Sequence, residues 1–226
     1  MLPTTLEEIA NYIVANGKGI LAADESTGTI EKRFKSIDVE STEENRRKYR
    51  EMLFRSSAMT EAIGGVILFD ETLRQNAADG TPLREVILSQ KSLPGIKVDQ
   101  GVKPFNGSSI EKSTQGLDGL DDRCKEYDKL GAKFTKWRAV INIEESIPSD
   151  DCIKYNMISL AKYASIAQKN NMVPIVEPEV IMEGNHSIDQ CYDATEKVLV
   201  KLFELLDKEN VNIKGTLLKP NMVVSG

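Results

Sequence analysis

Charged side chains recur where short apolar segments of this chain end. Lysine, aspartate and glutamate are rarely buried unless a partner or a function keeps them there. A single charge beside a strand is usually a solvated loop residue, but here five of six apolar segments carry one. If these segments are parallel strands, their carboxyl ends meet at one edge, where α/β folds place their sites. We therefore expect one site that combines cations and carboxylates, built from Asp24, Lys97, Asp99, Lys136, Arg138, Glu177, Glu179 and Lys219.

This mixture of charges suits carbonyl chemistry on an anionic substrate. A lysine amine condenses with a ketone when it is deprotonated, and partial burial beside a second ammonium, such as Lys136, favours the neutral amine. The protonated imine that results withdraws electrons, so that an adjacent carbon–carbon bond can break. Carboxylates shuttle the protons, and the remaining cations hold phosphate. Such chemistry needs no metal and no cofactor.

The histidine count restricts the alternatives. His186 is the only histidine, so sites that need two or three imidazole ligands for a metal are excluded. A Ser-His-Asp triad would have to use this same residue, which lies in the polar stretch EGNHS at 183–187. We expect a surface loop residue here and predict no metal site.

The remaining composition is that of an ordinary globular protein. The 226 residues fit one large α/β domain, and we expect residues 1–226 to form a single domain. A net charge of −6 argues against nucleic acid as a partner, because phosphate neutralisation needs clustered lysine and arginine. A local basic pocket for a small phosphorylated ligand remains open.

The cysteines and the hydropathy indicate where the protein works. The three cysteines, Cys124, Cys152 and Cys191, are odd in number and far apart, which favours a reducing compartment over a disulfide framework. The first ten residues lack the basic and apolar regions of a signal peptide. No apolar run approaches the ~20 residues that cross a bilayer. We expect a cytoplasmic protein with no membrane partner.

Six apolar segments of strand length must position the charges. Strands buried on both faces read as near-continuous apolar runs, and the spacing leaves room for a helix after each one. This repeat predicts a parallel sheet, either a closed eight-stranded TIM barrel or an open doubly wound sheet. No G-x-G-x-x-G or P-loop motif follows a strand, which disfavours nucleotide binding. The segments are residues 19–23, 64–69, 95–98, 133–140, 173–176 and 215–218.

Helical patterns fill the intervals between these segments. Ser41-x-x-Glu44 is typical of a capping box and predicts a helix from Glu43 to Ser56, and Ser187-x-x-Gln190 predicts another that runs to about Lys208. Apolar residues at helical spacing predict three more helices, over residues 6–15, 117–130 and 153–167. The sequence ends just after the sixth strand, and a barrel cannot close with six of its eight strands. We therefore expect a chain that is cut short.

The motifs around these charges resemble class I fructose-bisphosphate aldolases, and the resemblance covers essentially the whole chain. The lysine motif LLKPNM is highly specific, and the motifs taken in order are more specific still. The matching segments are KGILAADESTGTI (18–30), STEENRRKYR (41–50), GVILF (65–69), GIKVD (95–99), STQGLDGL (113–120), KWR (136–138), VPIVEPE (173–179) and GTLLKPNM (215–222).

The resemblance implies a TIM (β/α)8 barrel, here its first six βα units, and a role for each motif residue. Lys219 would form a Schiff base with the substrate ketone. Glu177 would be the acid–base group for carbinolamine dehydration, and Asp24 would orient or deprotonate the hydroxyl whose proton loss drives cleavage. Lys136 and Arg138 would contact substrate, with Lys136 also tuning Lys219.

Other residues would support these roles. Glu179 would pair with the two cations of the KWR motif. Lys97, Ser26 and Thr29 would hold one phosphate, and Arg33 and Arg46 are weaker candidates for substrate contact. Trp137 faces away from its charged neighbours, because successive strand residues alternate between faces, and we expect it to pack in the core.

The sequence also departs from the family pattern. Thr29 stands where the family usually has serine, Val224 replaces a threonine, and Gln100 replaces a lysine near the mouth of the site. Family members continue through two more strands, which supply a second phosphate site of serine, glycine and arginine and a mobile tail ending in tyrosine. The resemblance further implies a homotetramer for the full-length family.

The resemblance implies a metal-independent glycolytic lyase that cleaves fructose 1,6-bisphosphate into dihydroxyacetone phosphate and glyceraldehyde 3-phosphate. Two rival hypotheses remain. One is another imine-forming barrel enzyme, such as a transaldolase-like transferase. The other is a catalytically impaired, aldolase-derived interaction protein, because the chain ends after the sixth strand.

Overall fold

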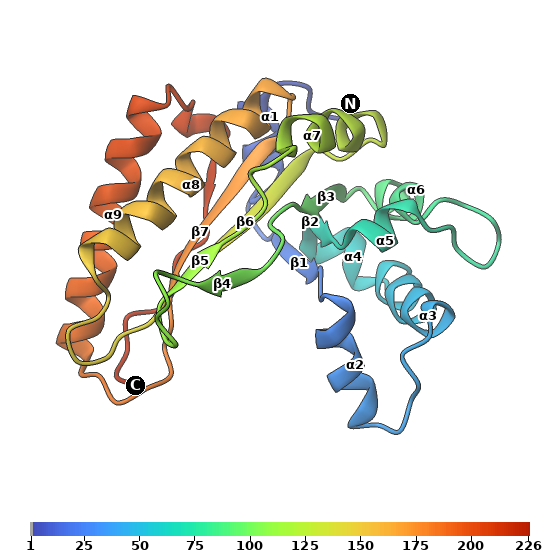
Figure 1. Cartoon of the computed structure of the whole chain (residues 1–226). Coiled ribbons are helices and arrows are strands. Elements are labelled where there is room, and N and C mark those ends of the chain that lie inside the picture. The colour runs from blue at the N-terminus through green and yellow to red at the C-terminus, as the bar shows by residue number, and fades with distance from the viewer. Residues whose placement is uncertain (1) are drawn as a thin grey trace.

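The structure, a computed structural model that describes residues 2–226, is built on a curled sheet of six parallel strands (Figure 1). The strands follow one another in the sheet in the order in which they occur in the sequence, so the predicted parallel sheet is confirmed. Each lies within about two residues of its predicted segment at its start. Their bounds are β1 (Gly19–Ala23), β2 (Ile63–Leu68), β3 (Leu93–Lys97), β6 (Phe134–Ile141), β7 (Val173–Val180) and β8 (Leu217–Leu218).

The helices of the βα units and one hairpin complete the fold. The five predicted helices are present as α1 (Leu6–Ile13), α3 (Glu43–Phe54), α7 (Leu120–Lys129), α8 (Asp150–Lys169) and α9 (Ile188–Lys208). Four other helices were not predicted, namely α2 (Thr27–Lys35), α4 (Ala58–Ala62), α5 (Asp70–Arg74) and α6 (Leu83–Ser89). The antiparallel pair β4 (Val102–Pro104) and β5 (Lys112–Thr114) was not predicted either. None of the helices within residues 2–226 has the length and apolarity to cross a membrane.

The core has two parts, one on each face of the sheet. Helices α8 and α9 cover the outer face of β6 and β7 (Figure 1). Trp137 of β6 is fully buried there and stacks on Tyr163 of α8 at 5.4 Å between ring centroids, so its predicted packing role is confirmed. On the other face, α1 packs Ile9 and Ile13 against Ile67 and Phe134. This arrangement fills the amino-terminal part of the curl and leaves the carboxyl ends of the strands for polar residues.

Two local predictions at helix and strand ends were wrong. The N-cap of α3 is Thr42, whose hydroxyl accepts from the Asn45 amide at 3.1 Å. Ser41 cannot fill that role because Arg46 Nη1 donates to its carbonyl and its hydroxyl, at 2.6 and 3.4 Å. The last predicted strand is shorter than residues 215–218, because Gly215 closes a 3₁₀ turn, η1 (Ile213–Gly215). The capping box Ser187–Gln190 is confirmed.

The prediction that His186 is a surface residue was also wrong. Its side chain is buried, and its carbonyl accepts from the Gly226 amide at 2.9 Å. The segment after β8 covers the loop that carries His186. The polar residues around His186 had indicated an exposed loop, and this is why the prediction failed.

Gly64 of β2 marks the closest contact between the sheet and α1. A Cβ at this position would lie 2.1 Å from the carbonyl oxygen of Ile13. We expect Gly64→Ala to lower the free energy of unfolding by about 3 kcal/mol, because backbone atoms cannot rotate away from the clash. Urea unfolding followed by circular dichroism measures the change.

Gly28→Ala is the matched control. A Cβ at Gly28 in α2 would meet nothing within 4 Å, so the same substitution should be neutral or stabilising by up to about 1 kcal/mol. Equal destabilisation by the two variants would contradict this account of the α1 contact.

Candidate active site

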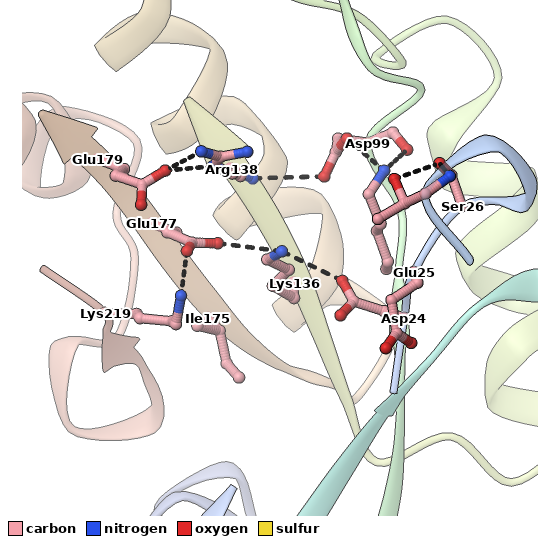
Figure 2. Close-up of polar contacts among 12 residues, drawn as sticks. Asp24, Glu25, Ser26, Asp99, Lys136, Arg138, Ile175, Glu177, Glu179 and Lys219 are labelled. Atoms are coloured by element: carbon pink, nitrogen blue, oxygen red, sulfur yellow. Dashed lines mark hydrogen bonds and ion pairs between the residues drawn. The ribbon is translucent and has the colours of Figure 1, made fainter. Parts of the chain in front are cut away.

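A chain of four charged side chains crosses the carboxyl ends of β1, β6, β7 and β8. Lys136 Nζ donates to Asp24 Oδ2 at 3.1 Å. The same nitrogen lies 3.1 Å from Glu177 Oε2 in an ion pair. The other oxygen of that carboxylate, Oε1, accepts from Lys219 Nζ. Figure 2 shows the resulting line of groups, in the order Lys219, Glu177, Lys136 and Asp24.

The strand register explains why these groups meet. Lys136 is opposite Ile175 on β7, so Glu177 is the next residue on the same face of that strand. Val176 pairs with Leu218, and the Lys219 amide donates to the Val176 carbonyl at 2.9 Å, which places Lys219 just past the end of β8. Asp24 follows directly after β1. The predicted convergence of charges from several strands is therefore present in the fold.

Burial differs sharply along this chain of charges. The side chains of Lys136 and Glu177 are 10% and 3% exposed, whereas that of Lys219 is 51% exposed. Burial opposes the charge on Lys136, but attraction by Asp24 and then Glu177 outweighs it and raises the pKa of Lys136 above the ordinary 10.5. Lys136 is therefore a fixed cation between two carboxylates, and Lys219 is the lysine that a ligand can reach.

A second set of charges lies farther along the same edge. Arg138 pairs with Glu179, as predicted for one of the two cations of the KWR motif. The other cation, Lys136, is bound by Asp24 and Glu177 and not by Glu179. Lys97 donates to the carboxylate of Asp99 and, at 2.8 Å, to its carbonyl. Asp99 also accepts from the Arg138 amide at 3.4 Å, which links the two strands.

The first turn of α2 presents hydroxyl groups at this edge. Ser26 is the N-cap of α2, and its hydroxyl lies 3.0 Å from that of Thr29. Arg33, one turn later, pairs with Glu25. An anion placed at this helix start would meet amide groups and the positive end of the helix dipole as well as the hydroxyls.

A cavity of about 850 Å³ lies between the α2 turn and the charged residues of β3 and β6. It is lined by the α2 turn, by Lys97 and Asp99, and by the two cations of β6. Glu177 and Lys219 do not line it and lie on the far side of Lys136. The opposite wall carries Tyr127, which donates to Asp70 at 2.9 Å. Burial, assisted by Asp70, raises the pKa of Tyr127 to about 12, so this phenol stays protonated near neutral pH.

Arg46 does not reach the cavity. Its guanidinium donates two hydrogen bonds to Glu71, at 2.6 and 2.9 Å, and a third to the Ser41 carbonyl. The structure therefore separates Arg46 from the predicted substrate contacts and brings Arg33 to them. Within residues 2–226 no group of three or more histidine, cysteine, aspartate or glutamate side chains has the arrangement of a metal site.

A family comparison gives this geometry a context. The model of the glycolytic class-I fructose-bisphosphate aldolase family matches residues 5–226. This chain belongs to the class-I fructose-bisphosphate aldolase family.

Individual aldolases show the same relationship. A probable fructose-bisphosphate aldolase class 1 from Xanthomonas axonopodis pv. citri is 53% identical over 98% of this chain and 66% of its own length. Fructose-bisphosphate aldolase C of Carassius auratus is 54% identical over 98% of this chain and 61% of its own length. The chain thus spans a little under two thirds of the length of these relatives.

A solved structure of Plasmodium falciparum fructose-bisphosphate aldolase, in complex with TRAP and a small-molecule inhibitor, superposes with a TM-score of 0.95 at 49% identity. The match covers 98% of this chain and 64% of that one. The curled six-stranded sheet is accordingly part of a TIM barrel, and the predicted fold and family are confirmed.

Among the residues that sequence reasoning missed at this aldolase-family site, two charged ones adjoin the α2 turn. Glu25 lines the cavity next to Asp24, and Arg50 is buried behind it. Both lie inside motifs that carried the resemblance, ADEST and STEENRRKYR. The spacing of the arginines in α3 could have indicated Arg50. Arg46 and Arg50 lie one turn apart on the same face of the helix, so both are removed from solvent if that face packs inward.

The raised pKa of Lys136 predicts a pH dependence of stability. A lysine whose pKa is higher in the folded chain contributes stability that is complete below pH 10.5 and is lost as the pH rises through the folded value. At pH 8 we expect Lys136→Met to lower the free energy of unfolding by about 3 kcal/mol, because Asp24 loses its cation and the buried Glu177 keeps only Lys219. The difference from wild type should shrink above pH 11.

Urea unfolding at several pH values measures this difference. Lys154→Met, at an exposed lysine of α8, controls for the loss of a positive charge. A deficit of Lys136→Met that stays constant between pH 8 and 11.5 would contradict the prediction.

Proposed function

We propose that this chain carries the Schiff-base site of a fructose-bisphosphate aldolase, which cleaves fructose 1,6-bisphosphate to dihydroxyacetone phosphate and glyceraldehyde 3-phosphate. One observation carries the proposal: the reachable amine of Lys219 shares the Glu177 carboxylate with the buried cation Lys136. The relatives named above are aldolases, and this chain spans a little under two thirds of their length.

The first half of the reaction is imine formation. Glu177 first accepts a proton from the Lys219 ammonium. The free amine then attacks the ketone carbon C2, and a proton passes from the nitrogen to the former carbonyl oxygen to give a carbinolamine. Glu177 then donates a proton to the hydroxyl that leaves as water, and the protonated imine remains. Since Glu177 already bonds the amine through Oε1, it is within reach of both the nitrogen and the oxygen on that carbon.

The second half is cleavage of the bond between C3 and C4. Asp24 accepts the proton of the C4 hydroxyl, the C3–C4 electron pair moves toward the imine, and an aldehyde and an enamine result. Lys136 lies between the two carboxylates. It separates them, so that Glu177 and Asp24 can act as acid and base in different steps. Arg138 lines the cavity and would donate hydrogen bonds to the substrate.

The direction of the substrate follows from these roles. With C2 at Lys219 and the C4 hydroxyl at Asp24, the sugar runs toward the cavity, and its C6 phosphate reaches the α2 turn. Ser26, Thr29 and Lys97 would bind this phosphate, with Arg33 close by; all four line the cavity. Lys97 would exchange its contact with Asp99 for the phosphate, and the Arg138 and Gly101 amides would still hold that carboxylate.

The cellular setting is part of the same proposal. An enzyme of sugar phosphate metabolism would act in the cytoplasm, without a metal or a cofactor. We also propose that assemblies containing this chain are tetramers, as expected for full-length members of the family. Gel filtration with light scattering would measure the number of subunits.

Borohydride reduction tests the nucleophile. In the presence of dihydroxyacetone phosphate we expect a covalent adduct on the peptide that contains Lys219, found by mass mapping, because reduction fixes the imine. Lys219→Arg should abolish the adduct. Lys214→Arg, at a lysine five residues away in η1, should keep it. An adduct that persists in Lys219→Arg, or one that maps to Lys136, would refute the assignment.

Glu177→Gln tests the proton donor. Without the acid, we expect the adduct with dihydroxyacetone phosphate to form slower by roughly 10²- to 10⁴-fold, since dehydration of the carbinolamine loses general acid catalysis. The rate is measured by quenching with borohydride at increasing times. Glu183→Gln removes a charge from the exposed loop after the same strand and should form adduct at the wild-type rate. Equal rates in wild type and Glu177→Gln would exclude Glu177 as the acid.

A further inference from the structure

Arg50 is a fully buried cation that the proposed chemistry does not use. It lies in α3, and its side chain is 0% exposed. Nη1 donates to Thr72 Oγ1 of α5 at 3.0 Å, and Nη2 donates to the Glu25 carbonyl at 2.8 Å. The Glu25 carboxylate is its ion-pair partner, at 3.4 Å. Arg50 therefore joins two helices to the turn between β1 and α2.

A buried guanidinium requires a reason, because removing its charge from water is costly unless close partners compensate. Arg50 has one carboxylate within ion-pair distance, and that contact is long. Among residues 2–226, its buried Nε has no hydrogen-bond partner. The next acid is Glu71, whose pKa is lowered mainly by hydrogen bonds from Arg46 and further by the attraction of Arg50. The core thus retains more positive charge at Arg50 than its contacts neutralise.

Glu25 connects this buried charge to the cavity. Its carboxylate is 8% exposed and lies between two guanidinium groups, Arg50 on the core side and Arg33 on the cavity side. The Arg33 side chain is 59% exposed. One carboxylate cannot neutralise two guanidinium groups, so the group of three carries a net positive charge at the cavity wall. Without Arg50, Glu25 and Arg33 would cancel, and an anion at the α2 turn would meet a neutral pair.

The hydrogen bond to the Glu25 carbonyl adds a geometric effect. A trans peptide directs its carbonyl and the following amide to opposite sides. When Arg50 fixes the Glu25 carbonyl toward the core, it fixes the orientation of the Glu25–Ser26 peptide as well. That peptide leads directly into Ser26, the N-cap of α2, whose hydroxyl contacts Thr29.

We infer that Arg50 is a positioning residue for the C6 phosphate subsite: it holds the β1–α2 turn in its binding conformation and offsets the charge of Glu25, so that Arg33 stays available to an anion. This inference rests on the proposed function for the identity of the ligand. It concerns one end of the substrate only. Arg50 touches neither Lys219 nor Glu177, so imine formation itself should not depend on it.

A pair of ketose phosphates separates this role from a general effect on folding. Fructose 1,6-bisphosphate carries the C6 phosphate and fructose 1-phosphate does not, while both present the same C2 ketone to Lys219. The measurement is the ketose concentration that gives half-maximal borohydride-trapped adduct on the full 226-residue chain. Arg50→Lys keeps the positive charge but loses the paired donors of the guanidinium group. Arg47→Lys is the control: it makes the same change in the same helix, at a residue whose ion-pair partners among residues 2–226 are Glu44 and Glu51.

In Arg50→Lys we expect the half-maximal concentration of fructose 1,6-bisphosphate to rise by about tenfold, the effect of losing a charge-assisted hydrogen bond. That of fructose 1-phosphate should stay within about twofold of wild type, and Arg47→Lys should match wild type with both sugars. Equal increases for the two sugars would show a structural role only, and no increase for either would show no role. Both results overturn the inference.

Two further measurements keep the test decisive. If Arg50→Lys lacks a cooperative melting transition, Thr72→Val replaces it, because loss of the Nη1 acceptor should raise the value for the bisphosphate alone by about threefold. If wild type traps neither sugar, the proposed function fails, and binding of inorganic phosphate by calorimetry then decides about Arg50. Weaker binding in the Arg50 variant than in Arg47→Lys supports the inference, and equal binding overturns it.

Discussion

The site depends on one carboxylate, Glu177, that is shared by two ammonium groups. Its two oxygens face Lys136 on one side and Lys219 on the other, and it is almost completely buried. A buried carboxylate is tolerated only with such partners, so the position of Glu177 constrains both lysines. The sheet holds β6, β7 and β8 in the register that this contact requires.

The contacts divide the site into two electrostatic parts. Around Lys136, the carboxylates of Asp24 and Glu177 balance the ammonium groups of Lys136 and Lys219 and favour proton transfer between fixed groups. Around the α2 turn, Lys97, Arg33 and Arg50 outnumber the nearby acids, Asp99 and Glu25, and favour an anion. A net charge of −6 for the whole chain conceals this separation, because the excess acid lies elsewhere on the surface.

The extent of what the sequence predicts follows from which interactions are local. Strand positions, the alternation of Lys136 and Trp137, and the Ser187 cap depend on neighbours in the chain, and they were predicted. The capping residue of α3 was missed because Arg46 bonds Ser41. His186 was misplaced because the segment after β8 covers it. The Arg46–Ser41 contact spans five residues, whereas the contact between His186 and Gly226 joins distant parts of the chain. Neither contact can be read from cap motifs or local polarity.

The residues of the site show the same division, with a further distinction. Lys219, Lys136 and Asp24 could be expected at one edge because parallel strands share it, and Arg33 and Arg46 could not be ranked without knowing which helix face turns toward the cavity. Arg50 was missed for a different reason: arginine is rarely fully buried, so burial was not expected for it. Its energetic cost is offset only by the turn that it fixes, and that turn presents Ser26 and Thr29. A charge that a stable core would avoid is thus retained beside the turn that we propose to bind an anion, and its burial is itself an indication of that function.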